Sequence, residues 1–279
     1  MTKKVILLMI VIVLTTGSAV APDMNRFLRV SDGKIISFSQ MIEELKKVNL
    51  VFVGEVHDDS DHHRLQLAVI KAFHEADAPI AIGLEMFKSN NQTILDSWVQ
   101  GKLPLDKFVP AYYDNWGLPW PVYQDIFLYA RVHEIGLLGL NVPGWLTEKV
   151  ARDGFAALSK DERSLLPPGI SCNLDDKYRE FVRKAYSGHS FHDRMFDHFC
   201  EAQMVWDKSM AWNLMQYLKK NPARTVVVLA GVGHAWKRGI PEQVSLESSF
   251  TSRVILPLIP EQIEINTVTT KDADYVMLY

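Results

Sequence analysis

The stretch "NLVFVGE" (residues 49–55) decides the fold. Its apolar residues run without the polar alternation of a half-exposed strand, so it predicts a strand covered on both faces. Three later stretches have the same character: "PIAIGLEMF" (79–87), "LLGLNVP" (137–143) and "RTVVVLAGVGH" (224–234). Two further strands are expected near the end of the chain, at 253–258 and 274–279.

Helical patterns separate the first of these strands, at 39–47, 61–76, 90–99 and from 122 onward. Strands that alternate with helix-length segments predict parallel βαβ units, and therefore an α/β fold with a mostly parallel sheet flanked by helices. Residues 146–220 break this alternation, because they hold helical patterns at 146–158, 175–187 and 193–220 and no strand. We interpret 146–220 as a helical insertion over the carboxyl ends of the strands, within a single α/β domain that covers residues 22–279.

The composition fits one large folded domain. The chain has 279 residues, of which 48% are hydrophobic and 23% charged, so it can bury a sizeable core. Its net charge is −3, and no basic run alternates with aromatic residues. We therefore do not expect nucleic acid as a partner.

The N-terminus has the form of a secretory signal peptide, residues 1–21. Lys3 and Lys4 precede an apolar stretch at 5–14, and small residues follow it. This stretch is short for a membrane span, which needs about twenty residues, although a short membrane anchor stays open. We expect an exported, periplasmic protein. Cys172 and Cys200 would then lie where disulfides persist; they could pair, or Cys200 could be a buried thiol in its apolar helical pattern.

Each of the four core strands carries a polar side chain at or just after its carboxyl end. Glu55 and His57 follow the first strand, Glu85 lies in the second, Asn141 in the third, and His234 follows the fourth. Ligands of open parallel sheets bind beyond the carboxyl ends of the strands, so we expect these side chains to share one site. An ionised carboxylate in apolar surroundings also needs a partner, as Glu85 does between two apolar neighbours.

The two histidines follow the same local pattern, Gly54-x-x-His57 and Gly231-x-x-His234. A glycine where a strand turns lets another group approach the backbone closely. Two histidines with a carboxylate can hold a metal ion, with His57, Glu85 and His234 as ligands. They can equally act as an acid–base pair, with Glu55 as a further catalytic residue. The other histidines on helical faces are expected to be solvated: His62, His63, His74 and His133.

Several motifs together resemble the ChaN family of haem-binding bacterial proteins associated with iron uptake. They occur in the family's order between about 38 and 257: "LVFVGEVHDD", "IAIGLEMF", "WGLPWPVYQDIFLYARVHEIGLLGLNVP", "EAQMVWDKSMAWNL" and "VVVLAGVGHAWKRGIPE". The resemblance implies haem binding, with cofacial haems at a dimer interface and tyrosine as the iron ligand. The wider group, with the Tiki proteases, TraB-like proteins and erythromycin esterases, shares the two G-x-x-H motifs and a glutamate. These remoter relatives imply hydrolysis at the His/Glu site, with a divalent metal ion in the Tiki case.

The helical insertion suits a flat apolar ligand such as haem. Its last helix carries methionines and aromatic residues, which either line a haem site or form an ordinary core stripe. Tyr178 or Tyr186 is the expected axial ligand, and His189, His192 and Arg194 are expected at the propionate edge. The chain lacks the lipobox cysteine that many members of the family carry, so we expect a soluble periplasmic protein.

Three functions follow from this sequence. The leading one is a non-enzymatic, exported haem-binding protein in haem or iron uptake, with a homodimer on haem binding and an outer-membrane receptor or transport protein as partners. The second is a metal-dependent hydrolase, protease-like or esterase-like, that uses the two G-x-x-H motifs and Glu85. The third is a partner-binding domain that keeps the strand-end site as a relic.

Overall fold

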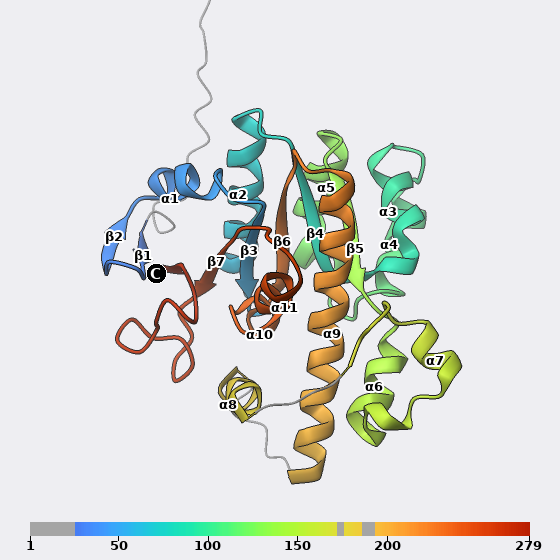
Figure 1. Cartoon of the computed structure of the whole chain (residues 1–279). Helices are drawn as coiled ribbons and strands as arrows, with labels where there is room; N and C mark the ends of the chain where they lie inside the picture. Colours follow the sequence, from blue (N-terminus) through green and yellow to red (C-terminus); the bar gives the residue numbers. More distant parts are fainter. Residues whose placement is uncertain (1–25, 172–175, 186–192) are drawn as a thin grey trace, which may run out of the picture.

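The computed structural model describes residues 26–171, 176–185 and 193–279. Its strands are β1 (Phe27–Arg29), β2 (Lys34–Ile36), β3 (Leu50–Glu55), β4 (Ile80–Lys88), β5 (Gly136–Asn141), β6 (Thr225–Gly231), β7 (Ser252–Pro257) and β8 (Tyr275–Met277). They form one eight-stranded sheet in the order β2-β1-β8-β7-β3-β6-β4-β5 (Figure 1). The strands from β8 to β5 are parallel, and β1 and β2 add an antiparallel edge.

Helices cover both faces of the sheet. One layer consists of α1 (Phe38–Leu45), α2 (Ser60–Glu75), α3 (Gln92–Val99), α4 (Leu105–Tyr113) and α5 (Trp120–Val132). The other contains α9 (Asp193–Lys220), α10 (Val232–Ala235) and α11 (Ile240–Glu247). Val51 and Val53 of β3 pack into the first layer, whereas Leu50 and Phe52 pack into the second. This two-sided burial is the reason that the strand carries no alternation.

The helices between β5 and β6 lie beyond the carboxyl ends of the strands (Figure 1). They are α6 (Gly144–Asp153), α7 (Lys160–Ser164), α8 (Asp176–Ala185) and the first half of α9. Leu214 and Leu218, in the second half of α9, pack against the sheet with Val226 and Val228. The predicted fold class is confirmed: an α/β fold whose mostly parallel sheet carries helices over its carboxyl edge.

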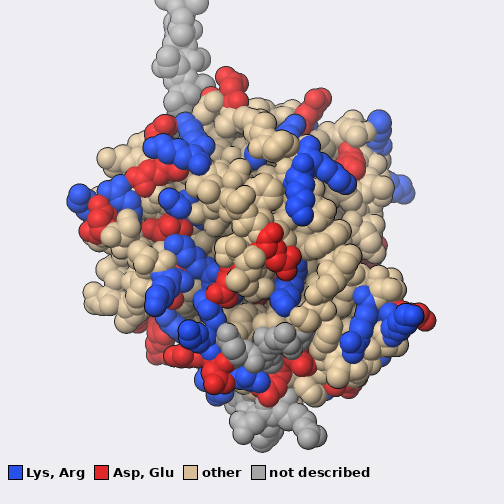
Figure 2. Space-filling model, viewed as in Figure 1, with Lys and Arg blue, Asp and Glu red and all other residues tan. Residues whose placement is uncertain are grey.

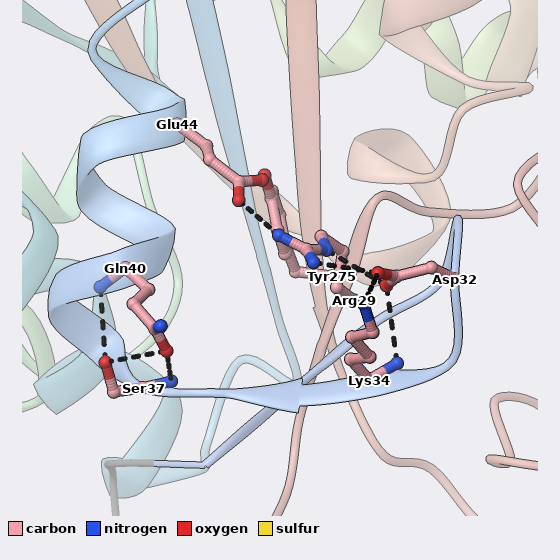
Figure 3. A network of polar contacts seen from close by, with 7 residues as sticks. All are labelled: Arg29, Asp32, Lys34, Ser37, Gln40, Glu44 and Tyr275. Atoms are coloured by element: carbon pink, nitrogen blue, oxygen red, sulfur yellow. Dashed lines mark hydrogen bonds and ion pairs between the residues drawn. The ribbon is translucent and has the colours of Figure 1, made fainter.

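The antiparallel edge is held by a polar network that the sequence did not reveal (Figure 3). Arg29 of β1 donates to Glu44 Oε1 of α1 at 2.5 Å and also bonds to Asp32. The Tyr275 hydroxyl of β8 donates to Glu44 Oε2 at 2.5 Å. One glutamate of α1 therefore links β1 of this edge to the neighbouring strand β8. Strands β1 and β2 have three residues each and, unlike β8, do not belong to a longer apolar run, which explains why they were not predicted.

Two expectations from the sequence concern the signal peptide and the two cysteines. The predicted signal peptide and Cys172 lie outside the described residues. Cys200 is a free, buried thiol of α9, and its burial raises its pKa to about 12. Within the described ranges, no helix is both long and apolar enough to cross a membrane.

The central strand gives a direct test of this layer arrangement. Leu229 of β6 is fully buried between β3 and β4. Leu229→Ala is expected to lower the free energy of unfolding by about 2–5 kcal/mol, because it leaves a cavity inside the core. Leu246→Ala removes the same side chain where it is 72% exposed, and should change that free energy by less than about 0.5 kcal/mol. Urea unfolding measures both, and equal effects would contradict the arrangement.

Candidate strand-end site

The structure brings the predicted side chains together around one cavity at the carboxyl edge of the sheet. Glu55 ends β3 directly beside Gly231 at the end of β6, and Glu85 comes from β4 on the other side of β6. The cavity measures about 610 Å³. It is lined, among others, by Glu55, His57, Glu85, Asn141 and His234.

Glu55 is completely buried and accepts hydrogen bonds from three elements. His57 Nδ1 donates to its Oε1 at 2.8 Å, and Gln66 Nε2 of α2 donates to its Oε2 at 2.7 Å. The Tyr123 hydroxyl of α5 also donates to Oε1. His63 Nε2 lies 3.2 Å from Oε2 without the alignment of a hydrogen bond. Burial alone would raise the pKa of Glu55, but His57 and His63 outweigh it and hold the pKa at about 2.

His57 is fixed by Glu55 on one side and faces Gly231 on the other. A Cβ atom on Gly231 would lie 2.9 Å from His57 Nε2 and 3.6 Å from Glu85 Oε2, so only glycine leaves room for the ring. The edge of the ring meets Trp116 at 5.1 Å between ring centroids. Burial lowers the pKa of His57, but the bond to Glu55 and the charge of Glu85 outweigh it and raise the pKa to about 9.

His234 repeats this arrangement with a different carboxylate. It lies on α10, directly after β6, and its Nδ1 donates to Asp207 Oδ1 of α9 at 2.7 Å. Its Nε2 lies 3.8 Å from Glu85 Oε1. Burial lowers the pKa of His234, yet the charges of Glu85 and Asp207 raise it overall. Both imidazoles are thus held at Nδ1 by a buried carboxylate.

Glu85 lies between the two imidazoles and is tied to the sheet. Its Oε2 accepts from the Gly231 backbone N–H at 2.6 Å, and its backbone carbonyl accepts from Asn141 Nδ2 at 3.0 Å. Gly54, the other glycine of the repeated motif, is needed for packing, since a Cβ there would lie 2.7 Å from Leu256. The two motif glycines therefore serve different contacts, although both permit a close approach.

Asp207 is a site residue that was not predicted from the sequence. It is a buried acid inside the apolar helical stretch "EAQMVWDKSMAWNL". Like Glu85, it is a carboxylate in apolar sequence and therefore needs a partner, which is a signal that could have found it. Gln66 and Tyr123 were missed as well, because nothing in a helical pattern fixes which polar side chain faces the end of a strand. Trp116 was missed because it lies in the loop between α4 and α5, where no periodic pattern places a side chain.

Two histidines expected in solvent are buried instead. His62 is 2% exposed and His63 is 7% exposed, both on the first turn of α2. His62 Nδ1 accepts from the Val56 backbone N–H at 3.0 Å, and its Nε2 bonds with the Tyr279 hydroxyl. Burial lowers the pKa of His62, which suits this neutral, accepting form. These contacts hold the segment that carries His57.

The residues expected at a haem site fall into two groups. Tyr178 is buried in α8, and its hydroxyl donates to Asp207 Oδ2 at 2.9 Å. Arg194 belongs to the first turn of α9, but its side chain is not among those described. The remaining candidates lie outside the described residues: Tyr186, His189 and His192.

The insertion and the strand ends nevertheless meet in one place. Phe199, Gln203 and Trp206 of α9 line the same cavity as His57 and His234. The Trp206 ring meets the His234 ring edge-on at 5.8 Å. The methionines of α9 divide between core and surface: Met204, Met210 and Met215 are buried, whereas Met195 is 57% exposed.

The geometry suits proton transfer, hydrogen bonding or metal ligation. An imidazole whose Nδ1 is held by a carboxylate keeps a fixed ring orientation and a basic Nε2, which suits an acid–base role as well as ligation. Among the residues that the structure describes, no group of three or more His, Cys, Asp or Glu side chains is arranged to hold a metal ion.

The fold and this site define the class of protein: an α/β protein with paired G-x-x-H motifs at the carboxyl ends of its strands. The chain belongs to the family of haem-binding uptake proteins named after ChaN, whose model matches residues 41–244. None of the curated proteins compared with this chain matches it.

Two solved structures show how far the fold extends. A structure described as cofacial haem binding to ChaN of Campylobacter jejuni superposes with a TM-score of 0.73 at 22% identity. The superposition covers 92% of this chain and 98% of that one. An H289N mutant of the erythromycin esterase EreC, in an open conformation, gives a TM-score of 0.50 at 16% identity, over 84% of this chain and 76% of that one. At these identities the two likenesses establish the fold.

The contact between Glu55 and His57 predicts a measurable titration. In the folded protein His57 should titrate near pH 9, and Glu55→Gln should move its pKa down towards the ordinary value of 6.5. Asp58→Asn is the matched control, since Asp58 acts on His57 through its charge and has a smaller effect than Glu55. Because the folded-state pKa is raised, the protonated ring stabilises the fold below about pH 6.5 and this contribution is lost as the pH rises towards 9. Histidine NMR titration measures this shift, and an unchanged pKa in Glu55→Gln would refute the assignment.

Proposed function

We propose that this protein binds haem and takes part in haem or iron uptake as an exported protein. The observation that carries the proposal is membership of the haem-binding uptake family over residues 41–244. That span includes the strand-end cavity and all four helices that cover it, α6 to α9.

The chemistry of the cavity supports haem as the ligand. Haem is flat and largely apolar with two carboxylates at one edge, so its site needs aromatic walls and polar groups at one side. Trp116, Phe199 and Trp206 provide aromatic surface, and His57 and His234 provide polar groups. Trp116 Nε1 is also buried without a hydrogen-bond partner among the described residues, which leaves one donor for a ligand.

The axial ligand belongs to the same proposal. A tyrosine of the covering helices, Tyr178 or Tyr186, would hold the iron, with His189, His192 and Arg194 near the propionates. Tyr178 now donates to Asp207, so ligation by Tyr178 requires that this bond is given up. Since Asp207 also accepts a hydrogen bond from His234, loss of the bond from Tyr178 would directly alter the surroundings of His234.

A homodimer that forms on haem binding, and an outer-membrane receptor or transport protein as a further partner, complete the proposal. The cofacial haems named for ChaN of Campylobacter jejuni support the dimer, since two haems face to face place two protein surfaces close together. Light scattering behind size exclusion should give a monomer without haemin and a dimer with one equivalent. An unchanged mass on haemin addition would refute the dimer while leaving haem binding intact.

A hydrolase is the second candidate, and a specific observation favours it. Two imidazoles held at Nδ1 by buried carboxylates flank Glu85, an arrangement that suits acid–base catalysis. It ranks second because the family whose model matches this chain is a family of haem-binding uptake proteins. Hydrolysis of ester or amide substrates that disappears with a chelator would favour this candidate.

Haemin titration tests the leading function. The purified protein should take up haemin in a fixed ratio and develop a Soret band. Tyr178→Phe or Tyr186→Phe should remove the phenolate charge-transfer band and most of the affinity, because each substitution removes only the ligand oxygen. Tyr217→Phe, at a half-buried tyrosine on the second half of α9, is the control and should bind haemin normally.

Two outcomes would contradict this assignment in different ways. If both tyrosine variants bind haemin normally while His57→Ala or His234→Ala abolishes binding, the iron is held at the strand ends. If the wild-type protein develops no Soret band, haem binding itself is wrong.

A further inference from the structure

A second cavity, separate from the strand-end site, has a basic lining. It measures about 520 Å³ and lies between α8, the segment from α10 to α11, the start of β7 and the loop before β8. It shares no lining residue with the strand-end cavity. Its charged lining consists of four cations and one carboxylate: Lys177, Lys237, Arg238, Lys271 and Glu242.

Two of these cations are already neutralised. Lys237 Nζ lies 2.9 Å from Asp274 Oδ1, and Arg238 donates to Glu242 Oε1 at 2.8 Å. Lys177 and Lys271 are exposed, and their ammonium groups have no ion-pair or hydrogen-bond partner among the residues that the structure describes. The cavity therefore concentrates positive charge on a chain whose net charge is −3. In the region of the visible face where Figure 1 places α8 and α10, several Lys and Arg side chains lie together with Asp and Glu side chains between them (Figure 2).

We propose that this cavity binds a phosphate-bearing ligand. A phosphate monoester carries about −1.5 to −2 charges at pH 7 and three acceptor oxygens, which matches two free ammonium groups held beside one space. The cavity falls in the range of small-molecule sites, roughly 300–1,000 Å³. It can therefore hold a phosphate together with the group that carries it. Ser245 and Ser252 add hydroxyl groups to the lining.

The concave shape favours one compact anionic group over an extended acidic surface of another protein. Such a group has two sources, a soluble phosphate compound or the headgroup of an anionic phospholipid. Leu246, which follows the lining residue Ser245 on α11, is 72% exposed and places apolar surface next to the basic cavity. A headgroup at a lipid surface would contact both.

The test uses the full chain with two probes at low ionic strength, where exposed charges are least screened. Calorimetry measures binding of inorganic pyrophosphate, and cosedimentation measures binding to vesicles of phosphatidylglycerol and phosphatidylcholine against phosphatidylcholine alone. Lys177→Glu with Lys271→Glu should weaken binding of the effective probe on the order of tenfold or more, because two charged contacts become repulsive. Lys102→Glu with Lys220→Glu makes the same charge change at exposed lysines elsewhere and should leave binding unchanged.

The two probes separate the sources. Binding of pyrophosphate without vesicles indicates a soluble phosphate compound, and binding to the anionic vesicles alone indicates a lipid headgroup; either result supports the proposal. The proposal is overturned if the wild-type protein binds neither probe, or if both double variants lose binding equally. Haemin uptake should be unchanged in the Lys177/Lys271 variant, and its loss would assign the cavity to the haem site instead.

Discussion

Glu55 is a buried, ionised carboxylate at the end of a central strand, and its need for hydrogen-bond donors constrains the surrounding structure. An ionised group in an apolar interior is costly unless donors surround it. Here the donors come from three places: Gln66 from α2, Tyr123 from α5, and His57 from the segment between β3 and α2. Two helices of one layer must therefore pack so that a polar side chain of each reaches the same carboxylate. The hydrogen bond from His57 to Glu55 also fixes the orientation of the His57 ring. The burial of Glu55 therefore determines both how this layer packs and how the site is arranged.

The second imidazole extends this dependence to the helices over the carboxyl edge. Asp207 of α9 holds His234, and Tyr178 of α8 holds the other oxygen of Asp207. The second half of α9 packs on the sheet, while Phe199 and Trp206 of the same helix line the cavity. A movement of α8 or α9 would therefore change the surroundings of His234. From the sequence, the strand-end site and the haem-binding insertion were expected to be separate, but residues of both line one cavity.

The parts of this structure that the sequence predicted share a physical cause. Continuous apolar runs mark strands buried on both faces, and the four core strands follow them closely. The strand-end rule placed Glu85 and His234 beside one cavity because every parallel strand must present its carboxyl end at the same edge. The three-residue strands β1 and β2 escaped because they carry no periodic pattern. Helix α4 was not predicted because Pro110 lies inside it, and proline usually ends a helix. Asp207 escaped for another reason: a helix reaches a site by its rotation and its docking, and neither can be read from spacing alone.

The helices that cover the strand ends determine which ligand a protein of this fold binds. An erythromycin esterase shares the architecture with a TM-score of 0.50 at 16% identity, and ChaN of Campylobacter jejuni shares it with 0.73 at 22%. A fold shared by a haem-binding protein and an esterase does not select the chemistry, which lies in the site built on it. In this chain the strand ends supply imidazoles and carboxylates, which suit many ligands, whereas α9 supplies aromatic rings directly above them. A flat apolar ligand gains most from those rings, since burial of apolar surface is the largest favourable contribution that such a cavity offers. Selectivity for haem over a smaller polar substrate would therefore depend on α9. The two imidazoles held by carboxylates could form hydrogen bonds with either kind of ligand.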